Sequence, residues 1–156
     1  MKKILVAFVL FTLISTVSIS VNADSDSVEK LAPIYVNNHE MVDTLGEEGL
    51  FLVYRKIEMD TPISNAIKEA LSLELTQKEK DMGFSTEWGD EDHEVTLKGV
   101  SLGKGKLTIE LNDPFRFTSG GSARVRSLKN QIKETALQFK AVDEVHFIGH
   151  EHLFQP

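Results

Sequence analysis

Segments with strand patterns and segments with helix patterns alternate along this chain, and their order constrains the fold more than any other feature. Residues 62–71 and 122–140 carry apolar residues at helical spacing. Strand patterns occupy residues 32–36, 50–57, 95–102, 106–111 and 142–149. This order predicts an α+β domain, with a small mixed β-sheet and two main helices packed on one of its faces.

Both main helices begin at recognisable signals. Asp60 and Thr61 are capping residues, and Pro62 suits the first helical position because its missing N–H would have no partner there. Further on, Thr76-Gln-Lys-Glu79 is a capping-box pattern, which predicts a short helix from Gln77 to about Met82. The long second helix follows the stretch Ser119-Gly-Gly-Ser122.

A hairpin is expected around Gly103-Lys104-Gly105. In its second strand, Leu107, Ile109 and Leu111 alternate with polar residues, so one face should be buried. The apolar positions of its first strand change phase at Gly99, which predicts a β-bulge there.

The first 23 residues are organised like a secretory signal peptide. Lys2 and Lys3 supply positive charge, an apolar run begins at Ile4, and Val21 and Ala23 are the small residues that precede a cleavage site. The competing interpretation is a membrane anchor, but the apolar run is slightly short for a span and contains several Thr and Ser residues. We expect cleavage after Ala23 and a secreted protein of the cell envelope.

Cleavage would leave a polar leader over residues 24–31 and a single domain over 32–156, a length that can bury its own core. Cysteine is absent, so neither a disulfide nor a lipid attached to Cys is available. Removing Lys2 and Lys3 leaves 15 basic against 24 acidic residues and changes the formal charge from −7 to −9. Such a surface disfavours nucleic acid and anionic lipid as partners.

Several of these segments share a distinctive set of motifs. They are IYV at 34–36, LVYRKI at 52–57, TPISNAIKEAL at 61–71, VSLGKGKLTIELNDPF at 100–115, GGSARVRSLKNQIKETALQF at 120–139 and VDEVHFIG at 142–149. With them the chain resembles, over residues 32–150, the GerMN domain of sporulation and spore-germination proteins of the GerM type. Related domains occur in other envelope proteins of Gram-positive bacteria.

The chain also departs from that pattern. A Gly-Pro that usually follows the first helix is replaced by Leu73-Glu-Leu-Thr76, and the family's Gln-Ile-Val-x-Thr-Leu run reads QIKETA at 131–136. Many members are lipoproteins, whereas this chain lacks the required Cys. The resemblance implies a fold related to the ring-building-motif folds and a scaffold or interaction role. It implies no catalytic residue and no cofactor.

Three histidines near the C-terminus suggest an alternative, a metal-dependent hydrolase. His146, His150 and His152 could converge on Zn²⁺ if the last strand continued to the end of the chain. Gly149 interrupts that strand, and groups to orient the imidazoles are not evident. The competing interpretation is a strand end that happens to contain histidine.

Other chemistry finds weaker support. The acidic run 89–94 could hold Ca²⁺, but its spacing does not match an EF-hand loop. No G-x-S-x-G elbow is present. The stretch Ser119–Ser122 could bind an anion at a helix N-terminus, with Arg116, Arg124 and Arg126 nearby, although simple capping is the more common role.

Aromatic residues in two loops are the candidate binding residues. Trp88 lies in the loop 83–94, with the alternative that it folds onto the edge of the core, and Phe115 and Phe117 lie in the loop 113–121. We expect a non-catalytic module that binds an envelope protein or peptidoglycan, in sporulation or germination. Regulation of an exported enzyme and homo-oligomerisation are the remaining options.

Overall fold

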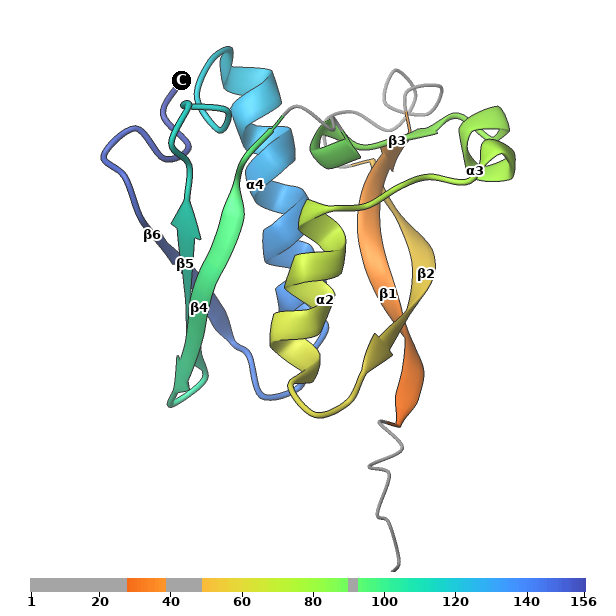
Figure 1. Ribbon diagram of the computed structural model, residues 1–156, viewed down its shortest axis with the longest axis horizontal. Helices are drawn as coiled ribbons and strands as arrows, with labels where there is room; N and C mark the ends of the chain where they lie inside the picture. Colours follow the sequence, from red (N-terminus) through yellow and green to blue (C-terminus); the bar gives the residue numbers. More distant parts are fainter. Residues whose placement is uncertain (1–27, 39–48, 90–92) are drawn as a thin grey trace, which may run out of the picture.

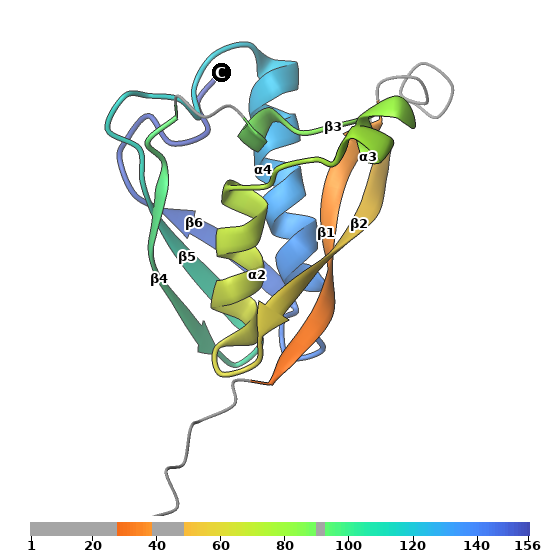
Figure 2. The same ribbon diagram turned by 45° about the vertical axis from the view of Figure 1, so that its right-hand side comes forward.

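Two three-stranded sheets enclose the two main helices in the computed structural model, which describes residues 28–38, 49–89 and 93–156. The first sheet has the order β2-β1-β3 and the second β4-β5-β6. Both views place α2 and α4 between them (Figures 1 and 2). The elements run in the order β1 (Glu29–Asn38), β2 (Leu50–Glu58), α2 (Pro62–Leu71), α3 (Gln77–Asp81), β3 (Phe84–Ser85), η1 (Glu87–Gly89), β4 (Thr96–Gly103), β5 (Lys106–Asn112), α4 (Ser122–Leu137) and β6 (Glu144–Ile148).

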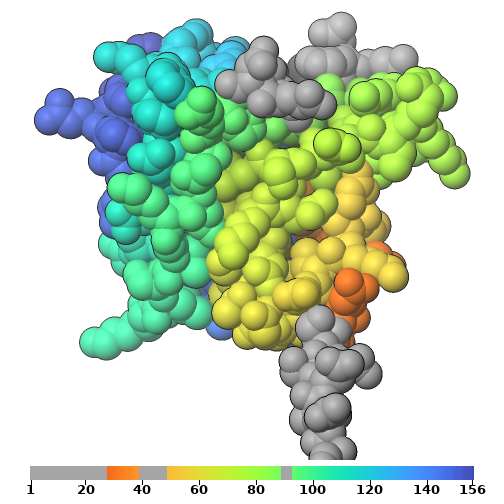
Figure 3. Space-filling view, in the orientation of Figure 1, coloured from red at the N-terminus to blue at the C-terminus, as the bar shows by residue number. Residues whose placement is uncertain are grey.

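The α+β class is confirmed, and each sheet packs its inner face on the helices. The strands form two sheets where the sequence suggested one, because α2 is apolar on two sides. Ala66 and Ala70 face a core shared with β1 and β2, whereas Ile67 and Leu71 face a core shared with β5 and α4. Figure 3 shows α2 at the surface between the strands of the two sheets.

Alternation along the strands explains both cores. In β5, Leu107, Ile109 and Leu111 are buried, as predicted, and in β1 the residues Ile34 and Val36 are fully buried. The predicted bulge is confirmed, since the register between β4 and β5 shifts between Leu97 and Gly99. β4 is antiparallel to β5, and β6 is parallel to it, so the second sheet is mixed.

The first sheet is longer than predicted at its N-terminal end. β1 begins at Glu29, so residues 29–31 of the expected leader belong to the strand. A second addition is β3, whose Ser85 and Phe84 pair with the end of β1 inside the segment expected to be a loop. The capping box is confirmed, because Thr76 Oγ1 accepts from the Glu79 amide and the Glu79 carboxylate accepts from the Thr76 amide.

A polar side chain of α4 and that of its C-cap residue, Gln138, make hydrogen bonds to the edge of β1 that β3 leaves uncovered. Thr135 Oγ1 accepts from the Tyr35 amide at 3.1 Å, and Gln138 Nε2 donates to the Pro33 carbonyl at 2.6 Å. The first contact gives the buried Thr135 a partner, whereas the buried Gln131 accepts from Thr86 Oγ1 at 2.8 Å and donates to Ser127 Oγ at 3.2 Å. One edge of the first sheet is thus closed by a helix, and β2 forms the other.

The C-terminal segment folds back onto the loop before α4 (Figure 1). Asp113 holds this loop in place, because its buried carboxylate accepts hydrogen bonds from the Phe117 and Thr118 amides and from Thr118 Oγ1. Burial alone would raise the pKa of Asp113, but these hydrogen bonds lower it below its ordinary value. His152 Nε2 donates to the Asp113 carbonyl at 2.9 Å.

Within the described part of the chain, the longest helices are too short and too polar to cross a membrane.

Candidate functional site

The outer face of the β1–β2 ladder, turned away from the helices, is largely apolar. Cross-strand pairs on this face join Leu31 to Lys56, Pro33 to Tyr54, Tyr35 to Leu52 and Asn37 to Leu50. Three of the side chains are strongly exposed, Leu31 at 66%, Tyr54 at 57% and Leu52 at 40%. We call the set Leu31, Pro33, Tyr35, Leu50, Leu52 and Tyr54 the outer face.

The two strands are apolar on both sides, which is typical of strands covered on both faces. In β2, Val53 and Ile57 point into the core, while Leu50, Leu52 and Tyr54 point outward. A sheet that faces water on one side normally carries polar residues there. Within the described ranges, the outer face is thus a candidate binding surface.

An ion pair joins β2, one strand of the outer face, to the residues behind it. Arg55, between the two outward residues Tyr54 and Lys56, makes two hydrogen bonds to the Glu79 carboxylate, at 2.9 and 2.8 Å. A third bond runs from Arg55 to the Glu74 carbonyl at 2.9 Å. The Arg55 hydrogen bond lowers the pKa of Glu79 to about 2, against the opposing effect of burial, with the Thr76 amide and hydroxyl assisting. β2 is therefore fixed to α3 and to the segment before it.

Among the residues that the structure describes, charged side chains lie at one end of the outer face. Lys56 Nζ lies 3.6 Å from the Glu29 carboxylate, and both side chains are largely exposed, so the pair contributes little to stability. An apolar centre with a polar rim is the usual composition of a protein–protein interface.

The aromatic residues proposed from the sequence lie in different environments. Trp88 is 1% exposed, and its Nε1 donates to the Leu128 carbonyl at 3.0 Å, so it packs in the core and is not available as an exposed anchor. Phe117 is half-buried, with its ring 5.7 Å from that of Trp88 and under the Arg124 guanidinium at 4.5 Å. Only Phe115 among the three is strongly exposed, at 70%.

The three C-terminal histidines do not gather into a ligand set. His146 Nε2 lies 2.5 Å from the Glu144 carboxylate, and this hydrogen bond lowers the Glu144 pKa. His150 and His152 stack on each other at 5.2 Å, and His152 is bound to Asp113. In the ranges that the structure describes, no three His, Cys, Asp or Glu side chains are grouped as metal ligands. The arrangement required for the zinc hypothesis is thus missing from this part of the chain.

The two remaining candidates are the acidic run and the start of α4. Of the acidic run proposed for Ca²⁺, residues 90–92 lie outside the described residues, and His93 Nε2 contacts the carbonyls of Leu71 and Trp88. At the start of α4, Arg124 donates to the carbonyls of Phe117 and Ser119, so its guanidinium stabilises the loop before the helix.

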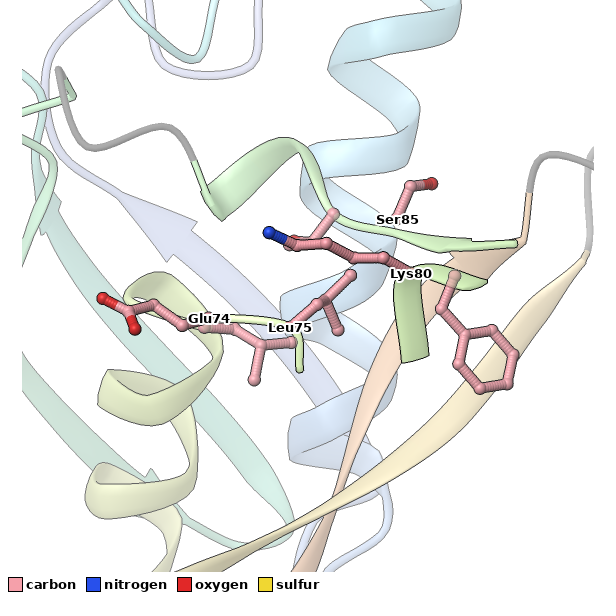
Figure 4. A pocket seen from close by; sticks show the side chains of 7 residues that line it. Glu74, Leu75, Lys80 and Ser85 are labelled. Atoms are coloured by element: carbon pink, nitrogen blue, oxygen red, sulfur yellow. The ribbon is translucent and has the colours of Figure 1, made fainter. Parts of the chain in front are cut away.

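A hollow of about 400 Å³ lies between α3, β3 and the segment that precedes α3. Apolar side chains of Leu73, Leu75 and Phe84 line it together with Glu74, Lys80, Ser85 and Thr86. Figure 4 shows the Lys80 side chain extending across the hollow, away from the Ser85 hydroxyl. Ser85 and Lys80 therefore do not form a nucleophile and base pair.

Comparison with known proteins identifies the fold. No protein-family model matches the chain, and no curated protein matches its sequence. Among solved structures, the tandem GerMN domains of the sporulation protein GerM from Bacillus subtilis match 81% of this chain with a TM-score of 0.54 and 17% identity. The chain spans 42% of the length of that protein chain. The first GerMN domain of the same protein matches 80% of this chain and 85% of its own, with a TM-score of 0.46 and 16% identity. This chain thus has a GerMN-like fold.

Proposed function

We propose that this chain is an exported, non-catalytic interaction module that binds another protein of the cell envelope through the outer face of β1 and β2. The observation that carries the proposal is the set of exposed apolar side chains on this face, with Leu31, Leu52 and Tyr54 all at least 40% exposed. Leaving them in water forgoes a stabilisation of roughly 1.5–3 kcal/mol per large side chain that burial would supply. A partner that covers them recovers that free energy.

The dimensions of the face suit a protein partner. From Leu31 to Asn37 the strands extend about 20 Å, and two strands with their side chains are about 10 Å wide, which gives a flat area of about 200 Å². A standard interface buries about 800 Å² per partner around an apolar centre. The outer face would form such a centre, and the polar residues around it would form the rim.

Placement in the envelope, and a role in sporulation or germination, are supported by two independent features. The first 23 residues have the pattern of a signal peptide. The fold is that of domains found in tandem in the sporulation protein GerM from Bacillus subtilis. Fold alone does not determine function, so the partner must be found by experiment.

The test compares two lysine substitutions at exposed apolar residues of edge strands. Tyr54→Lys places a charge at the centre of the outer face, whereas the matched control Leu102→Lys changes β4, in the other sheet, where Leu102 is 43% exposed. Each purified variant is used to recover proteins from an envelope extract and is separately pelleted with purified peptidoglycan.

We expect the original chain and the Leu102→Lys variant to recover the same envelope protein and the Tyr54→Lys variant to lose it. If the Tyr54→Lys variant pellets with peptidoglycan as well as the original chain does, the chain binds glycan, and it does so through another surface. Recovery of the same protein by all three chains would refute the role of the outer face.

A further inference from the structure

A groove follows the free edge of β6, in the sheet that the proposed interface does not use. β6 is the last strand of the order β4-β5-β6, so the main-chain groups along one of its sides lack a neighbouring strand in the described structure. The groove has a volume of about 620 Å³, and every residue from Glu144 to Glu151 lines it.

The walls of the groove show that it lies beside the edge of β6 and not over β5. Its remaining lining residues are Leu153, Phe154 and Gln155 of the C-terminal segment and Lys129 of α4, and none of them belongs to β5. Two aromatic residues are part of the lining, and the rings of Phe147 and Phe154 meet edge to face at 4.9 Å. A strand of five residues is about 17 Å long, so the groove can accept an extended segment of similar length.

Side chains of a strand added here would alternate between two environments. The inner row would face α4, where Lys129 Nζ lies 6.0 Å from the centre of the Phe147 ring. Arg126 and Lys133 lie three residues before and four residues after Lys129, on the same side of the helix but outside the lining, and Lys133 Nζ is 3.7 Å from the Glu134 carboxylate. The outer row would face Glu144 and His146, which are hydrogen-bonded to each other.

We propose that this groove binds an extended segment of a partner polypeptide as an added parallel or antiparallel strand along β6, with acidic side chains in its inner row. Main-chain hydrogen bonds to the β6 edge supply affinity that does not depend on sequence, and the basic row of α4 selects acidic residues at alternate positions. This site is independent of the outer face, because it lies on the other sheet.

The experiment selects binders from a display library of random nine-residue peptides on the purified chain. We expect the selected peptides to carry Asp or Glu at alternate positions and to shift the amide resonances of residues 144–149. Alternate main-chain amides of a paired strand point toward the neighbouring strand. Methylating the amides of a selected peptide that face β6 should therefore abolish binding, whereas methylating those that face away should not. Failure to select peptides, absence of the acidic pattern, or resonance shifts located elsewhere would overturn the proposal.

Two charge reversals complete the test. Lys129→Glu should weaken a selected peptide about tenfold, whereas Lys98→Glu, at an exposed lysine of β4, should leave its affinity unchanged. Tyr54→Lys should also leave it unchanged, since Tyr54 lies on the other sheet. An equal loss in the two charge reversals would show that only the net charge of the chain matters and would refute the assigned groove.

Discussion

The ion pair behind the outer face gives a prediction whose size can be worked out. The Glu79 carboxylate accepts two hydrogen bonds from Arg55, and its pKa falls from 4.5 to about 2. Each pKa unit corresponds to about 1.4 kcal/mol, so the full shift would stabilise the fold by about 3 kcal/mol at neutral pH. Because the two side chains remain 18% and 15% exposed, solvent screening lowers our expectation to about 2 kcal/mol.

The perturbation is Glu79→Gln, which keeps the shape of the side chain and removes its charge. A carboxylate whose folded pKa is depressed stabilises the fold above its unfolded pKa and loses that effect as the pH falls through the folded pKa. Urea unfolding should therefore show the variant about 2 kcal/mol less stable than the original chain at pH 7, about half of that near pH 3, and almost equal to it near pH 1.5.

Glu74→Gln is the matched control, because Glu74 contacts Arg55 through its backbone carbonyl. We expect this variant to unfold at nearly the same urea concentration as the original chain. A loss in Glu79→Gln that stays constant between pH 7 and pH 2 would contradict the electrostatic origin assigned to the pair.

Three further predictions concern the core and the C-terminal segment. Trp88, the single tryptophan, should fluoresce at short wavelength in the folded chain and shift to longer wavelength in urea; a red emission before unfolding would contradict its burial. Asp113→Ala leaves three hydrogen-bond donors without their acceptor and should cost about 3 kcal/mol in urea unfolding, with a smaller loss for Asp113→Asn. Gly149→Ala should lower the melting temperature by several degrees, because its Cβ would lie 2.5 Å from the Leu111 carbonyl oxygen; an unchanged melting temperature would contradict this contact.

Local signals in the sequence predicted the elements well. The alternation in β5, the bulge at Gly99 and the capping box at Thr76 each depend on residues close in sequence, and each is confirmed. The division into two sheets was not predicted, because it depends on which side of α2 meets which strands. Ala66 and Ile67 are adjacent in sequence but serve different cores.

The binding surface was the hardest feature to predict. The sequence left two interpretations for Trp88, an exposed loop residue or a residue folded onto the edge of the core, and favoured exposure for Phe117. Tertiary packing buries Trp88 and half-buries Phe117. The signal that could have found the outer face was the run from Leu50 to Ile57, which is apolar at both odd and even positions in its first five residues. Such a run indicates a strand with apolar side chains on both of its faces.

Site-specific photo-cross-linking at position 54 tests the central claim most directly. A benzophenone side chain replaces Tyr54 on the outer face in one chain and Ser101, an exposed residue of β4, in the control. After irradiation of intact cells, we predict one discrete cross-linked species at position 54 that contains a second envelope protein and is absent from position 101. No cross-link at position 54, or the same species from both positions, would contradict the account.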